Sequence, residues 1–127
     1  MKVLIIEDDK FIAEALVTKF KNNGFDIGRL DNGEKVVAEA IAQKPDIVIL
    51  DIMLPGKDGF EILKDLKKDD KTKNIPVVIV SNLGSKEDLE KGKQLGAAGF
   101  MIKATVTPEE IVEKAKEVIA KITTENR

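Results

Sequence analysis

The sequence predicts an α/β fold built on a five-stranded parallel sheet with helices on both faces. Three observations predict it. The chain has 127 residues, a length that suits one domain. Short apolar runs recur at intervals too wide for hairpins, and segments with helical periodicity separate them. The runs are continuous, as in strands that are covered on both faces.

Four strands are expected from strong apolar runs and a fifth from a weaker one. The strong runs are residues 3–6, 47–50, 77–80 and 100–102. Residues 26–30 are interrupted by Gly28 and Arg29, so this strand is expected at an edge. Right-handed crossovers with the second strand at an edge favour the order 2-1-3-4-5.

The helices are expected from apolar residues that repeat every three or four positions. Their apolar faces are Phe11, Ile12, Leu16 and Phe20; Val36, Val37, Ala40 and Ile41; Phe60, Leu63 and Leu66; and Ile111, Ala115, Val118 and Ile122. The helix between Ser85 and Gly96 has only Leu89 and Leu95 as large apolar residues. Gly92 in its middle costs up to about 1 kcal/mol relative to alanine, so we expect weak anchoring.

Two helix starts carry capping signals. Ser85 followed by Asp88, and Thr107 followed by Glu110, have the spacing of capping boxes. The domain is expected to cover residues 1–122, with 123–127 as a short C-terminal tail. No effector domain follows residue 122, so we expect a stand-alone domain or one excised from a longer chain.

The composition excludes several classes of function. The chain has no cysteine, which excludes a disulfide scaffold, a thiol nucleophile and cysteine-ligated zinc. It has no histidine, which excludes serine-histidine-aspartate triads, histidine-bound metals and phosphohistidine carriers. Lysines alternate with acidic residues at a net charge of −2, which argues against direct nucleic-acid binding. No apolar run is long enough to span a membrane, and a cytoplasmic location is expected.

Acidic residues follow the first and third strands. Glu7, Asp8 and Asp9 end the first, and Asp51 ends the third. Carboxyl ends of parallel strands share one edge, so at least three carboxylates should meet there. Such a cluster is unfavourable when bare and suits a hard cation such as Mg²⁺. The alternative is that Asp8 or Asp9 only caps the first helix.

Lys103 after the fifth strand and Ser81 after the fourth face the same edge. Lys103 should form a salt bridge with Asp51 and neutralise a phosphate oxygen when one is present. Taken singly, the lysine is more often solvated and the serine more often a turn former. Together with the acids they point to phosphoryl transfer, which needs no histidine or cysteine here. Asp51 is the best nucleophile, because a turn-rich loop over residues 54–59 follows its apolar strand.

Residues 46–59 strongly resemble the receiver domain of two-component response regulators. Glu7-Asp8, Ser81 and Lys103 match that family's pattern in order and spacing, and the resemblance covers residues 2–122. It implies a flavodoxin-like (βα)5 fold. By the same resemblance Asp51 would be the phosphoacceptor in a Mg²⁺-dependent reaction. The magnesium ligands would be Asp8 directly, Glu7 largely through water, Asp51, and the backbone carbonyl of Met53.

The resemblance also implies roles in switching. Ser81 and Lys103 would each bind a phosphoryl oxygen, and Phe100 would rotate inward as Ser81 moves. The alternative for Phe100 is ordinary core of the fifth strand. Two positions depart from the family pattern. Ala104 replaces the usual cis proline after the lysine, so this loop is either strained or trans. Asn82 replaces a small residue and would crowd the phosphodonor or hold a water.

The implied partners are a histidine kinase or histidine phosphotransfer protein as donor, and a protein target. The domain would catalyse only its own phosphorylation and dephosphorylation, act as a monomer or weak dimer, and reposition residues 85–96 on phosphorylation.

Three alternatives stay open. A haloacid-dehalogenase-like phosphohydrolase would need an acid where Met53 stands. A flavodoxin-like FMN carrier would need a phosphate loop where Glu7 and Asp8 stand. A receiver-like module without phosphorylation would not need the full set of acids, hydroxyl and lysine.

Overall fold

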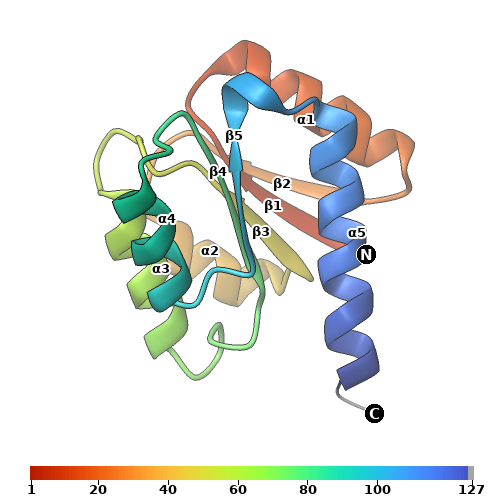
Figure 1. Ribbon diagram of the computed structural model, residues 1–127. Helices are drawn as coiled ribbons and strands as arrows, with labels where there is room; N and C mark the ends of the chain where they lie inside the picture. Colours follow the sequence, from red (N-terminus) through yellow and green to blue (C-terminus); the bar gives the residue numbers. More distant parts are fainter. Residues whose placement is uncertain (126–127) are drawn as a thin grey trace.

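Five parallel strands form the central sheet of the computed structural model, which describes residues 1–125 (Figure 1). The strands are β1 (Lys2–Ile6), β2 (Asp26–Leu30), β3 (Ile47–Leu50), β4 (Val77–Ser81) and β5 (Gly99–Ile102). The helices are α1 (Lys10–Asn22), α2 (Val36–Gln43), α3 (Gly59–Lys68), α4 (Lys86–Gln94) and α5 (Pro108–Glu125). The order β2-β1-β3-β4-β5 confirms the predicted topology.

The sheet is covered on both faces, with α1 and α5 on one side and α2, α3 and α4 on the other (Figure 1). Alternate residues of each strand enter the two cores. Val3 and Ile5 pack with α1 and α5, whereas Leu4 and Ile6 pack with α2 and α3. Because the strands other than β2 serve two cores, their apolar runs are continuous in the sequence, whereas the run of the edge strand β2 is interrupted.

Side-chain caps begin four of the helices. Asp9 accepts from the Ile12 N–H and caps α1, so the helix-cap alternative holds for Asp9. The predicted capping box is confirmed at α4, where Ser85 Oγ accepts from the Asp88 N–H at 3.1 Å. The second box is confirmed at α5 by mutual bonds between Thr107 and Glu110. Asp58 caps α3 through the Phe60 N–H at 2.8 Å.

Phe11 corrects the prediction for α1, because its side chain is 84% exposed. The buried face consists of Ala13, Leu16 and Phe20. At about 100° per residue, position 11 points roughly 160° away from Ala13, so it cannot share that face.

The C-terminal end of α5 also differs from expectation. The helix continues through Glu125, into the segment expected to be a tail, and residues 126 and 127 lie outside the described residues. Within residues 1–125, no helix is long and apolar enough to cross a bilayer.

Helix α4 is weakly anchored, as predicted. Its only buried residue is Gly92, and Leu89 is 39% exposed. A Cβ atom on Gly92 would lie 3.0 Å from both Ile79 Cδ1 and Phe100 Cδ2. The helix therefore approaches the sheet through its backbone and buries little side-chain area.

The two phenylalanines of α1 allow a direct test of which face of this helix is buried. Phe20 is fully buried and packs edge-on against Phe25, with ring centroids 4.9 Å apart. Phe20→Ala should lower the free energy of unfolding by about 3–5 kcal/mol through the cavity it leaves. Phe11→Ala should change it by less than about 0.5 kcal/mol. Urea titrations measure both, and similar losses in the two variants would contradict the assignment of the buried face.

Candidate functional site

Three carboxylates meet at the carboxyl edge of the sheet. Glu7 follows β1 and Asp51 follows β3, and these neighbouring strands pair Ile6 with Leu50. Glu7 is 2% exposed and Asp51 4%, whereas Asp8 faces solvent. One carboxylate oxygen from each of the three residues lies within 4.8 Å of the others. The strand ends thus bring the acids together as expected.

Lys103 joins this cluster from the far side of β4. It begins a 3₁₀ turn directly after β5. Its Nζ lies 2.7 Å from Asp51 Oδ2 and 2.6 Å from Glu7 Oε1, and its side chain is only 12% exposed. The predicted bridge to Asp51 is confirmed. The bond to Glu7 was not predicted, although adjacent strand ends put both acids within reach of one long side chain.

Burial and pairing set the protonation of this cluster. Burial raises the pKa of Glu7, and the bonds from Lys103 and from the Asp9 N–H offset only part of that rise. Burial alone would lower the pKa of Lys103, but its bonds to Asp51 and Glu7 outweigh burial and raise it. Lys103 therefore stays cationic and compensates the buried carboxylates.

The loop between β3 and α3 holds Asp51 in place. The Met53 N–H donates to Asp51 Oδ1 at 3.0 Å, and the Gly59 N–H donates to the Ile52 carbonyl at 3.0 Å. A Cβ atom on Gly59 would lie 2.8 Å from the Asp51 carbonyl oxygen, so only glycine fits this close approach. The Met53 side chain is 58% exposed, which leaves its backbone as the part near the site.

Ser81 ends β4, next to β3, and is fully buried. Its Oγ accepts from the Leu83 N–H at 3.3 Å. In residues 1–125, no hydrogen bond connects it to Asp51 or Lys103. Phe100 is half-buried and packs against the core that contains Leu50 and Ile79.

The two departures from the resembled pattern lie beside the site. No peptide bond in the described chain is cis, so the bond between Lys103 and Ala104 is trans. This bond lies in the 3₁₀ turn Lys103–Thr105, after which the chain continues to α5. Thr105 Oγ1 donates to the Ile102 carbonyl at 3.1 Å. Asn82 is exposed.

The donor set suits a hard divalent cation. Three carboxylates balanced by one ammonium leave two negative charges at the edge, and oxygen-only ligands are typical of Mg²⁺ sites. A carboxylate held beside a lysine and such a site can act as a nucleophile toward phosphorus.

One family accounts for this arrangement. The sequence profile of the response regulator receiver domain matches residues 3–116. The chain belongs to this family. It is therefore a receiver domain of two-component response regulators, a family of phosphoacceptor and switching domains.

Individual relatives agree with the family match. Protein PilH of Pseudomonas aeruginosa is 33% identical over 94% of this chain and 98% of its own length. The phosphate regulon transcriptional regulatory protein PhoB of Escherichia coli is 32% identical over 95% of this chain. The chain spans about half of PhoB, 52% of its length.

Solved structures show the same fold. The receiver domain of the Francisella response regulator 1452 has a TM-score of 0.86 at 31% identity, over 94% of this chain and 97% of that one. A response regulator structure from Chloroflexus aurantiacus also has a TM-score of 0.86, at 28% identity over the same shares of the two chains. The predicted flavodoxin-like fold is confirmed.

Removing the positive charge of Lys103 tests whether it compensates the buried carboxylates. Lys103→Met should lower the free energy of unfolding near neutral pH by about 3 kcal/mol, because two buried carboxylates lose their partner. A raised carboxyl pKa means that the folded state binds more protons than the unfolded state, so stability falls as pH rises through that window. The loss in the variant should therefore shrink on acidification through the pKa of Glu7.

Urea titrations at neutral and mildly acidic pH measure this effect. Lys114→Met is the matched control, since Lys114 makes only a surface pair with Glu117 at 3.6 Å. Its cost should stay below about 1 kcal/mol at either pH. A Lys103 variant as stable as the parent at neutral pH would refute the compensation.

Proposed function

We propose that this receiver takes a phosphoryl group onto Asp51 from the phosphohistidine of a histidine kinase or histidine phosphotransfer protein. The resulting aspartyl phosphate changes a surface that binds a protein target. The observation that carries the proposal is the Asp51 carboxylate, buried at the sheet edge beside Glu7 and bonded to Lys103 at 2.7 Å. Family membership supports it.

The transfer forms one bond and breaks one. An oxygen of Asp51 attacks phosphorus, the bond from phosphorus to the donor imidazole nitrogen breaks, and the imidazole keeps that electron pair and takes up a proton. Lys103 leaves the carboxylate and pairs with a phosphoryl oxygen. Ser81 Oγ already accepts from the Leu83 N–H, so its own hydrogen is free to donate to another phosphoryl oxygen.

Mg²⁺ fits the remaining oxygens of the site. Its ligands would be the carboxylates of Glu7, Asp8 and Asp51 together with the Met53 backbone carbonyl. When bound, the ion supplies positive charge for the phosphoryl oxygens and neutralises the acidic cluster. Protons compete with it for Glu7, whose pKa burial raises, so its affinity weakens on acidification.

The donor histidine lies outside these 127 residues, because they contain no histidine. An apolar groove between α1 and the start of α5 extends to Lys103, and Phe11, Ile12 and Pro108 are among its lining residues. We assign this groove to the donor protein, since it extends to Lys103, whose Nζ lies 2.7 Å from Asp51 Oδ2. The exposed Phe11 ring supplies apolar contact area for it.

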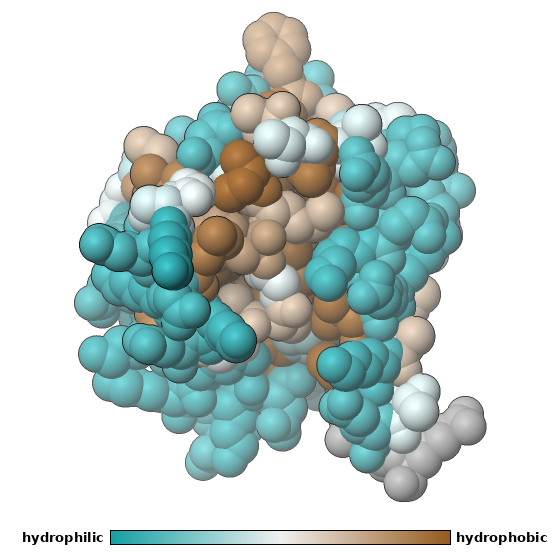
Figure 2. Space-filling view, viewed as in Figure 1, coloured by the Kyte–Doolittle hydropathy of each residue, from teal (hydrophilic) through white to brown (hydrophobic). Residues whose placement is uncertain are grey.

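The target surface in this proposal is the face formed by α4, β5 and α5. Figure 2 shows an apolar area between two strongly hydrophilic flanks on this face, where β5 carries the half-buried Phe100, Met101 and Ile102. Rotation of Phe100 next to Gly92 would link Ser81 to α4. The domain would work in the cytoplasm as a monomer or weak dimer, without direct nucleic-acid binding, and would catalyse only its own phosphorylation and dephosphorylation.

Acetyl phosphate with Mg²⁺ tests the phosphoacceptor. The parent should gain the mass of one phosphoryl group in intact-protein mass spectrometry, and hydroxylamine should remove it, as expected for an acyl phosphate. Asp51→Asn should gain nothing under the same conditions, because its amide is a poor nucleophile. An unmodified parent, or equal labelling of the two proteins, would contradict the proposal.

Amide hydrogen exchange tests the switch. A phosphoryl mimic such as beryllofluoride with Mg²⁺ should change the exchange rates across residues 86–94, because α4 buries only Gly92 and repacks at low cost. The buried face of α1 should not respond, and Asp51→Asn should respond nowhere. Unchanged amide exchange rates in α4 of the parent would contradict a role of this helix in the switch.

A further inference from the structure

The loop between β2 and α2 packs directly on the loop that carries the phosphoacceptor. The Gly33 N–H donates to the Pro55 carbonyl at 3.2 Å. Immediately before this loop, the Leu30 carbonyl accepts from the Glu7 N–H at 3.0 Å. Residues 30–33 therefore connect the acidic end of β1 with the loop that follows Asp51.

Gly33 fits this position only because it lacks a side chain. It is buried, and a Cβ atom there would lie 2.6 Å from Ile62 Cδ1 and 3.0 Å from both the Cβ and the carbonyl oxygen of Lys57. Two of these three atoms belong to the β3–α3 loop. A side chain at position 33 therefore pushes against both the Ile62 side chain and the backbone of that loop.

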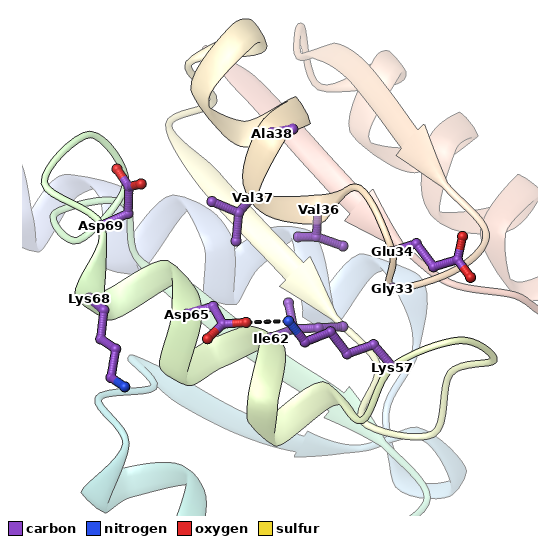
Figure 3. A pocket seen from close by; sticks show the side chains of 10 residues that line it. All are labelled: Gly33, Glu34, Val36, Val37, Ala38, Lys57, Ile62, Asp65, Lys68 and Asp69. Atoms are coloured by element: carbon purple, nitrogen blue, oxygen red, sulfur yellow. Dashed lines mark hydrogen bonds and ion pairs between the residues drawn. The ribbon is translucent and has the colours of Figure 1, made fainter.

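The same contact continues on either side of Gly33. Gly56 adopts a φ of +88°, and a Cβ atom on it would lie 3.0 Å from Glu34 Cγ. Lys57 forms an ion pair with Asp65. Figure 3 shows its side chain extending from the loop along α3 to Asp65, while Glu34 points away from that pair. The β3–α3 loop is thus held by β2–α2 on one side and by α3 on the other.

We propose that Gly33 is a positioning residue for the metal and phosphoacceptor site. It sets the place of the β3–α3 loop, and with it the Met53 carbonyl and the Asp51 carboxylate, to which the Met53 N–H donates. Gly33 itself touches neither metal nor phosphoryl group. The inference rests on the function proposed above, and it adds a second loop to the requirements of that site.

Gly33→Ala tests the inference, with Gly28→Ala as the matched control. Gly28 is also buried and crowded, but its Cβ atom would meet Gln43 and Leu4, away from the phosphoacceptor loop. Mg²⁺ affinity by calorimetry should fall about tenfold in Gly33→Ala, the range typical for residues that orient metal ligands. It should stay at the parent value in Gly28→Ala, even though both variants lose stability.

Hydrogen exchange without metal gives an independent readout. Amides of residues 53–58 should exchange faster in Gly33→Ala than in the parent, and at the parent rate in Gly28→Ala. If Gly33→Ala does not fold, the same two measurements on Lys57→Ala test whether contacts of the β3–α3 loop position the site. Loss of its surface pair with Asp65 should speed the same amides and weaken Mg²⁺ binding about twofold to threefold.

The outcomes separate this inference from the proposed function. Parent-like exchange and Mg²⁺ affinity in folded Gly33→Ala, or in Lys57→Ala when Gly33→Ala is unfolded, would overturn the positioning role. Equal loss of Mg²⁺ affinity in Gly28→Ala would overturn it too, because the effect would then be general destabilisation. A parent that neither binds Mg²⁺ nor accepts a phosphoryl group would instead overturn the proposed function.

Discussion

The ammonium group of Lys103 is the element on which the rest of the site depends. It lies between Glu7 and Asp51, two carboxylates that are almost completely buried. Burial raises the pKa of Glu7, and the bonds from Lys103 offset part of that rise. One cation thus compensates the charge of both buried carboxylates. Its long side chain also reaches past β4, so the end of β5 contributes to a charge cluster centred on β1 and β3.

The apolar sheet makes this charge cluster possible. Five strands end at the same edge, and each places polar residues just outside the two cores that fix its backbone. The surrounding loops add hydrogen bonds that leave the carboxylates little freedom, from the Asp9 N–H to Glu7 and from the Met53 N–H to Asp51. The two apolar cores stabilise the fold, while the repulsion between carboxylates is confined to one edge of the sheet.

The sequence predicted the strands and the meeting of the carboxylates with Lys103 at one edge, because both depend on local patterns. Continuous apolar runs identify strands buried on two faces, and their polar ends identify the edge. Other features depend on geometry that no local pattern contains. Phe11 repeats with the apolar residues of α1 but projects from another side. The bond between Lys103 and Glu7 requires the strand order, and the close approach at Gly33 requires two loops that are distant in the sequence. The functional roles of the site residues remain predictions that the proposed experiments address.

The burial of Gly92 has a consequence for the way such domains diversify. Because α4 buries only Gly92, its exposed side chains bury little area against the rest of the fold. Mutations there can accumulate at little cost to the fold, and they do not touch the residues at the acidic edge. Gene duplication followed by drift on this one helix can therefore alter the target surface proposed above while the residues of the acidic edge are inherited unchanged.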